Sequence, residues 1–158
     1  IAFSAVSGIL GTVLAGWLSD KVFKGDRVKP AVLSGIISTS SLILFLFVGG
    51  GFVLNIFYVS LFSLAVGVLY CIVAGLMAVD IVPRKATGAA LGVVGISSYV
   101  AAGLQDITSG YLIQGFTKVV DGVDVYNFTP VSWFWLVASI VSFILPVLNW
   151  KKMKSENN

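Results

Sequence analysis

The feature that most constrains this chain is a run of fifty residues, 30–79, that contains no Asp, Glu, Lys or Arg. Apolar stretches also occupy 1–18, 87–115 and 131–150. Runs of about 18 or more apolar residues are long enough to cross the hydrocarbon core as helices. Only 11% of the residues are charged, against roughly 25% in soluble domains, so most of the surface must face lipid. The sequence therefore predicts an all-α integral membrane protein whose first partner is the lipid bilayer.

Five membrane spans are expected, at 1–18, 31–49, 52–79, 87–115 and 131–150, followed by a tail at 151–158. The second begins at Pro30 or Ala31, since proline suits a first helical turn, and "GGG" at 49–51 ends it. Thr129 and Pro130 provide a cap and a first residue for the fifth span. The third and fourth spans are about 28 residues, or about 42 Å, long, so they should tilt or bend in a core of about 30 Å.

The basic residues indicate which side of the membrane each connection faces. Alternating spans place 19–30, 80–86 and 151–158 on one side, with nine of the ten cations. The opposite side has the "GGG" turn and the loop 116–130, in which Lys118 is the one cation and Asp121-Gly122 favours a small turn. The positive-inside rule then places the C-terminus in the cytoplasm.

Composition also excludes several classes of function. Histidine is absent and Cys71 is the single cysteine, so the chain lacks common metal ligands and can form no intrachain disulfide. The cations lie at span ends rather than along one face, which does not indicate nucleic-acid binding. We expect no enzyme activity, no metal and no cofactor. The chain begins in mid-helix at Ile1, and we expect it to be a piece of a longer protein.

Two charged segments carry more information than a positive-inside loop requires. The first, "GWLSDKVFKGDR" at 16–27, combines Gly16, Asp20, Lys21, Gly25 and Arg27. In it we expect Gly16 to admit a neighbouring helix, and Lys21, Lys24 and Arg27 to hold the connection at the membrane surface. The second is "DIVPRKATGAALGVVGISSY" at 80–99, with Asp80, Pro83, Arg84, Lys85, Gly88, Gly92 and Gly95.

The first segment resembles the loop signature of the major facilitator superfamily, in the form found in its organophosphate:phosphate antiporters. The second resembles the segment that leads into the eleventh helix of that family. The resemblance implies that the five spans correspond to helices 8–12 of a twelve-helix fold, with the N-terminal half missing. The third span would then line the central cavity, the first and fourth would face the other half, and the second and fifth would face lipid.

The same resemblance implies a function. Such proteins exchange a phosphorylated sugar or polyol, of the hexose 6-phosphate or glycerol 3-phosphate class, for inorganic phosphate by alternating access in a bacterial inner membrane. The arginines that bind phosphate would lie on the missing helices. Some hexose-phosphate members act as sensors rather than transporters, and the residues here leave both alternatives open, together with an unrelated cargo.

Polar residues on the fourth span are the candidate substrate-binding group. Asp106 is the one acid deep within a span, and such charges usually face a bundle interior or a water-filled cavity. Tyr99 lies seven residues earlier and matches the family's substrate-site tyrosine. Ser98, Gln105 and Ser109 extend the predicted polar stripe. The alternative is that Asp106 lies near the outer end of a long helix and is hydrated there.

The first and fourth spans are rich in small residues, and one position of the third span departs from the family pattern. Ser4, Gly8, Gly11 and Ala15 form a small-residue face on the first span, and five glycines of the fourth span favour close contacts or bending (Gly88, Gly92, Gly95, Gly103 and Gly110). Val68 stands where the family can place a second tyrosine. Tyr70 is about 200° further around the helix and cannot be assumed to replace it.

Overall fold

The computed structural model describes residues 2–120 and 122–156, with side chains described as far as residue 144 except at 120 and 143. Four helices in it are long and apolar enough to cross a membrane, and a shorter apolar helix, Thr129–Ser142, follows within the described side chains. The prediction of an apolar helical chain is confirmed at that level. One short β-hairpin is the exception to an all-α structure.

Each of the first three long helices contains a π-helical segment. The first long helix consists of α1 (Ala2–Trp17) and the π-helical segment η1 (Leu18–Val22). The second consists of α2 (Val28–Ile43) and the π-helical segment η2 (Leu44–Val48). The third long helix consists of α3 (Phe52–Tyr70), η3 (Cys71–Met77) and α4 (Ala78–Asp80). The 3-10 turn η4 (Arg84–Ala86) leads into α5 (Thr87–Gly115). The strands β1 (Lys118–Val120) and β2 (Val123–Val125) pair antiparallel before α6 (Thr129–Glu156).

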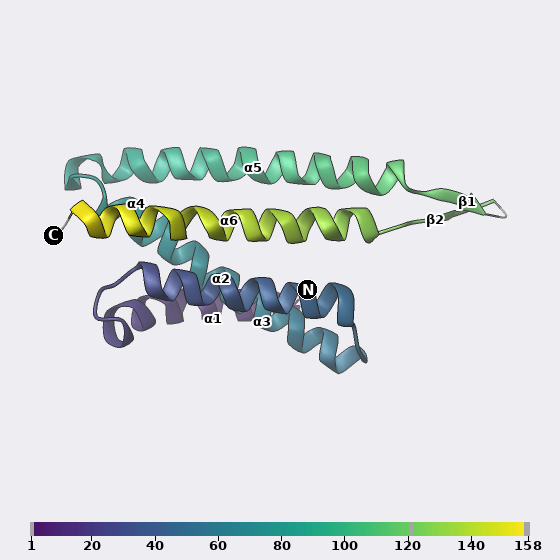
Figure 1. Cartoon of the computed structure of the whole chain (residues 1–158), viewed down its shortest axis with the longest axis horizontal. Helices are drawn as coiled ribbons and strands as arrows, with labels where there is room; N and C mark the ends of the chain where they lie inside the picture. Colours follow the sequence, from purple (N-terminus) through teal and green to yellow (C-terminus); the bar gives the residue numbers. More distant parts are fainter. Residues whose placement is uncertain (1, 121, 157–158) are drawn as a thin grey trace.

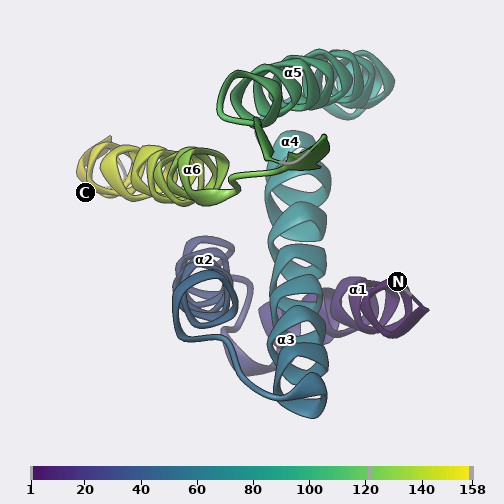
Figure 2. The same cartoon turned by 90° about the vertical axis from the view of Figure 1, so that its right-hand side faces the viewer.

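The third helix connects two groups of helices. Figure 1 shows α2, α5 and α6 running along the longest axis, with the hairpin beyond α5 and α6, whereas the helix α3–α4 runs obliquely to them. In the end-on view of Figure 2, α1 and α2 flank the lower part of the helix α3–α4 on opposite sides, α6 lies above α2, and α3–α4 runs upward to α5. We call the end at which 19–29 and 80–86 lie the basic end.

Two helix boundaries at the basic end differ from the prediction. The first helix continues past residue 18 to Val22, so Asp20 and Lys21 are helical rather than in a loop. The second begins at Val28 instead of residue 30 or 31. Asp26 explains the earlier start, because its Oδ1 accepts hydrogen bonds from the amides of Val28 (3.0 Å) and Lys29 (3.3 Å), which have no partner within the helix.

The fifth helix also begins earlier than expected, at Thr129 rather than 131. The predicted cap at Thr129 is wrong: the Asn127 side chain takes that place, its Oδ1 accepting the Thr129 amide at 3.0 Å. The backbone of α6 continues through the expected tail to Glu156. The predicted turn falls partly on Asp121, which lies outside the described residues; its neighbour Gly122 has a φ of +78°.

The core forms where α1 meets α3. Ala15, Ala31, Val68 and Ile72 make a buried apolar group. A Cβ on Gly11 would overlap the carbonyl oxygen of Leu64, and one on Gly67 would overlap that of Gly8. The small-residue face of the first span therefore makes the close helix contact expected of it.

Other predicted close contacts are not made within the described chain. A Cβ on Gly16 would meet no atom within 4 Å, and the same is true of all six glycines on α5, the five predicted ones and Gly115. Among the described residues, α3 approaches α1 at Gly8 and Gly11 rather than at Gly16, so the expectation that Gly16 admits a neighbouring helix stays a prediction. α5 stands largely clear of α1, α2 and α3, and the most hydrophobic part of its span contains no buried residue.

Candidate functional site: an arginine network that joins the two motifs

Arg27 is the centre of the site. It lies in the connection between η1 and α2, directly before Val28, where the second long helix begins. Lys24 and Gly25 both have positive φ, +53° and +88°, and this tight turn brings the chain back against the end of the first helix. Glycine favours such a backbone because it has no Cβ to clash.

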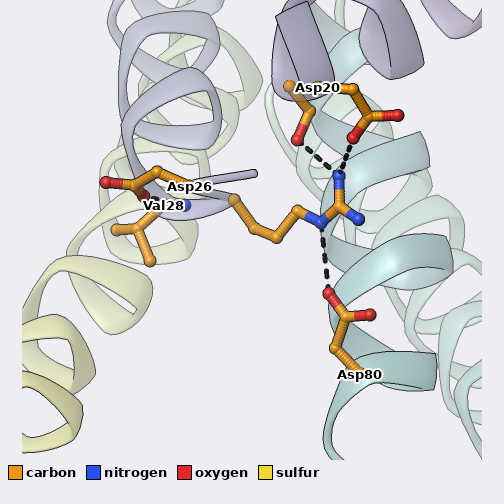
Figure 3. A network of polar contacts seen from close by, with 6 residues as sticks. Asp20, Asp26, Val28 and Asp80 are labelled. Carbon is orange, nitrogen blue, oxygen red and sulfur yellow. Dashed lines mark hydrogen bonds and ion pairs between the residues drawn. The ribbon is translucent and has the colours of Figure 1, made fainter. Parts of the chain in front are cut away.

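The guanidinium of Arg27 connects three segments. Its Nη1 donates to Ser19 Oγ at 2.6 Å and to Asp20 Oδ1 at 2.7 Å, both on η1. Its Nε donates to Asp80 Oδ2 at 3.1 Å, at the end of α4. Figure 3 shows the guanidinium between the carboxylates of Asp20 and Asp80. The two sequence motifs thus meet at one side chain, although Arg27 and Asp80 are 53 residues apart.

The network is partly protected from water. The Arg27 side chain is 23% exposed, whereas those of Asp20 and Asp80 are 67% and 51% exposed. Ser19 is fully buried. The hydrogen bond to Asp20 raises the pKa of Arg27, burial opposes that rise, and Asp80 adds to it. Arg27 is therefore always charged, and two carboxylates share its one charge.

Asp26, beside the network, forms a separate ion pair. Its Oδ2 lies 3.0 Å from Lys29 Nζ. Burial alone would raise the pKa of Asp26, but hydrogen bonds from the Lys29 side chain and from the Lys29 and Val28 amides outweigh it, and the pKa is lowered below its usual 3.8. The start of α2 is thus held by an ionised carboxylate, which the positive end of a helix favours.

This arrangement can act as a reversible clasp. Arginine's planar fork bonds two carboxylates at once, which fixes the ends of η1, α2 and α4 relative to one another. Exposed ion pairs are worth only about 0.2–1 kcal/mol each, so a modest rearrangement can break the contacts. The Arg27 side chain pairs with these two carboxylates, and the expectation that it also holds the connection at the membrane surface stays a prediction.

The remaining residues of the two motifs lie around this clasp. In the first motif, Lys21 is exposed on η1 and Gly25 forms the turn, while Gly16 lies five residues after Gly11, beyond the close contact with α3. In the second, Pro83 is extended, with φ −60° and ψ 147°, and separates α4 from η4. Arg84 and Lys85 follow it and are exposed. Gly88, Gly92 and Gly95 lie on α5 with open space beside them.

The candidate substrate residues of α5 fall into two groups. Ser109 is buried and accepts a hydrogen bond from Trp135 Nε1 of α6 at 2.9 Å. Gln105 borders a cavity of about 660 Å³ that is lined mainly by apolar side chains of α2, η2, α3 and α6. Tyr99 and Asp106 are exposed on another part of the helix surface, Tyr99 at 83%. Ser98 is half-buried and bonds back to Val94 O at 2.8 Å.

The polar residues predicted to form one stripe on α5 therefore do not share a single surface. Ser109 faces α6, whereas Tyr99 and Asp106 share an open side seven residues apart. Val68 is buried in the core and Tyr70 is 59% exposed, so Tyr70 does not take the place of a tyrosine at 68.

Sequence reasoning missed several contacts that fix these helices. They are the Arg27–Asp80 pair, Ser19 beneath it, the Trp135–Ser109 bond, and a 3.0 Å hydrogen bond between Thr39 of α2 and Ser139 of α6. For the Arg27–Asp80 pair, one signal in the sequence was usable. The two connections that contain this cation and this acid were predicted to lie on the same side of the membrane. Nothing in the sequence indicated that Thr39 and Ser139 would meet.

The apolar helices and the two motifs that meet at Arg27 agree with the comparisons: the chain is distantly homologous to transporters of the organophosphate:phosphate antiporter family of the major facilitator superfamily. It is 33% identical over 113 residues to the "Glycerol-3-phosphate transporter" of Bacillus subtilis (strain 168), covering 70% of this chain and 25% of that protein. It is 35% identical over 97 residues to the "Phosphoglycerate transporter protein" of Salmonella typhimurium (strain LT2), covering 60% of this chain and 20% of that protein.

The chain thus spans about a quarter and a fifth of the length of these two curated relatives. Both are transporters, not enzymes. No protein-family profile matches the chain, and no solved structure matches it.

Proposed function

We propose that this chain forms helices 8–12 of a secondary transporter that exchanges a phosphorylated polyol or sugar for inorganic phosphate by alternating access. The observation that carries the proposal is the Arg27 network, in which the two family motifs meet. Both relatives are named as transporters of phosphorylated three-carbon compounds, which supports the glycerol 3-phosphate class of cargo over hexose 6-phosphate.

The network supports alternating access because it is an ionic clasp at one end of the helices. A transporter of this kind must close one side of its cavity while opening the other. With Arg27 paired to Asp20 and Asp80, the ends of three helices stay together. When the pairs separate, each charged group can be hydrated, because both carboxylates are more than half exposed. We propose that the clasp is made in one state of the cycle and broken in the other.

The open side of α5 supplies the candidate substrate contacts. Tyr99 can donate a hydrogen bond to a phosphate or hydroxyl oxygen, and Asp106 can accept one from a polyol hydroxyl. Phosphate also requires cations, yet residues 30–83 and 86–117 contain no Lys or Arg. The binding charge must therefore come from helices outside these 158 residues, opposite the exposed surface of α5.

We also propose the topology. The basic end carries the connections 19–30 and 80–86, and the positive-inside rule places it in the cytoplasm together with the C-terminal tail. A bacterial inner membrane fits this arrangement, since both relatives come from bacteria.

Exchange in vesicles tests the proposal. Proteoliposomes loaded with phosphate and containing the chain joined to its upstream helices should take up labelled glycerol 3-phosphate, and external phosphate should compete. The 158 residues alone should give no exchange, because they lack the binding cations. Uptake that needs no internal phosphate would contradict exchange. Saturable binding without uptake would replace the transporter with a sensor.

A further inference from the structure

The basic end has more cations than its own carboxylates can neutralise. Segments 19–29 and 80–85 contain six Lys or Arg and three Asp. Arg27 takes Asp20 and Asp80, and Lys29 takes Asp26. The other four cations are exposed and form no ion pair among the described residues; we call them the basic rim: Lys21, Lys24, Arg84 and Lys85.

The rim spans two connections that the fold holds together. Lys21 and Lys24 follow Asp20, and Arg84 and Lys85 follow Asp80. Because Arg27 bonds both carboxylates, the two connections are tied at one point. Figure 1 shows both turns at the same end of the helices.

Exposed apolar side chains accompany these cations. Trp17 is 53% exposed and Val22 48% at the end of the first helix, and Ile81 is 74% exposed between Asp80 and η4. Tryptophan at a helix end is typical of the membrane–water interface, where one side of the ring meets acyl chains and the other meets headgroups. The rim therefore combines cations for an anion with apolar groups for hydrocarbon.

We propose that the basic rim binds the headgroups of anionic phospholipids in the adjacent leaflet. The phosphates would pair with the rim cations, while Trp17, Val22 and Ile81 contact the acyl chains beneath. The leaflet is favoured over a soluble anion because all four rim side chains are exposed, so a high local concentration of anions is needed to occupy them. Each Lys or Arg close to an anionic leaflet adds about a fivefold gain in association. This interaction does not depend on the proposed exchange activity.

Spin-labelled lipids measure the association directly. The 158-residue chain is reconstituted in phosphatidylcholine with a trace of labelled phosphatidylglycerol or labelled phosphatidylcholine, and the immobilised fraction is compared by electron paramagnetic resonance. We expect a preference of several-fold for the anionic lipid at 50 mM salt. Screening should reduce that preference towards one at 0.5 M salt.

Matched variants locate the site. The pairs Lys21→Gln/Lys24→Gln and Arg84→Gln/Lys85→Gln should each reduce the preference at least twofold, whereas Lys118→Gln, at the opposite end, should not change it. Lys21→Arg/Lys24→Arg should retain it, and circular dichroism checks that every variant is folded. The tail cations Lys151, Lys152 and Lys154 are the same in all variants, so their contribution cancels.

Two results would overturn the proposal. The first is a wild-type chain without anionic preference, or one whose preference survives both double substitutions. The second is displacement of labelled phosphatidylglycerol by millimolar inorganic phosphate but not by chloride at equal ionic strength, which would identify the rim as a site for soluble phosphate.

Discussion

At the scale of single residues, Arg27 depends on the shape of its side chain as well as on its charge. Nη1 and Nε of one guanidinium bond Asp20 and Asp80, which belong to different helices. Lysine has a single ammonium on a flexible stem and cannot present the same planar fork. Charge alone is thus insufficient to hold both carboxylates in this geometry.

Arg27→Lys should therefore weaken the clasp. We expect a coupling energy of about 1 kcal/mol between Arg27 and Asp80, measured in a double-mutant cycle with Asp80→Asn by thermal or denaturant unfolding in detergent. The variant Lys118→Gln, far from the network, is the control. Additive effects of the two substitutions would show that the 3.1 Å pair contributes no stability.

Asp26 predicts a dependence on pH. Because its folded-state pKa lies below the usual 3.8, the ionised carboxylate stabilises the fold at pH values above that, and the contribution is lost as the pH falls through the lower folded-state pKa. Stability of the wild type should drop more steeply between about pH 5 and pH 3 than that of Asp26→Asn, which keeps the Oδ1 acceptor but cannot titrate. Melting temperatures across this range provide the measurement; parallel curves would rule out the assignment.

At the scale of helices, one close contact fixes how the first helix packs. In lipid, helices gain little from apolar burial alone and associate through close van der Waals packing at small residues. Gly8 and Gly11 meet the backbone of α3 around Leu64 and Gly67. The contact leaves no room for a Cβ at Gly11.

Two Gly→Ala substitutions on the same helix distinguish a glycine that is needed for close packing from one that is not. Gly11→Ala should destabilise the chain by about 1–3 kcal/mol, because the new methyl overlaps the Leu64 carbonyl and the helices must move apart. Gly16→Ala, on the same helix with nothing within 4 Å, should be neutral or stabilising by up to about 1 kcal/mol, since alanine is the better helix former. Unfolding in detergent measures both, and equal effects would argue against the packing described.

At the scale of the whole molecule, the Arg27 clasp and the proposed substrate contacts are separated along the helices. Asp20, Arg27 and Asp80 lie at the basic end, whereas Tyr99 and Asp106 lie well along α5. A change at the clasp should then alter movement between states more than the affinity for cargo.

Asp20→Ala in the proposed transporter, with this chain joined to its upstream helices, tests that separation. We expect the exchange rate to fall about tenfold or more while the dissociation constant of the cargo changes less than about threefold, because one of the two carboxylates holding Arg27 is lost. Flux assays and equilibrium binding give the two quantities. A large loss of affinity with normal turnover would contradict the proposed role.

Much of this architecture follows from the sequence. The uncharged run at 30–79 and the three glycines at 49–51 indicated two long helices and the break between them, because hydrocarbon requires about 20 apolar residues per span. The two motifs at 16–27 and 80–99 indicated the family. The helix ends near Asp20 and Asp26 could not be predicted as well, because the sequence does not distinguish an aspartate that caps the start of a helix from one that follows the end of a span.

What the sequence determined by itself is therefore the membrane class, the course of the helices and their family, all of which depend on local hydrophobicity, charge and short motifs. Only the tertiary structure decided which residues meet: Arg27 with Asp80, Gly11 with the Leu64 carbonyl, and Ser109 with Trp135. It also divided the polar residues of α5 between a buried contact and an open side. These outcomes depend on how each helix is rotated and tilted against its neighbours, and that is set by packing across the bundle, which no local pattern encodes.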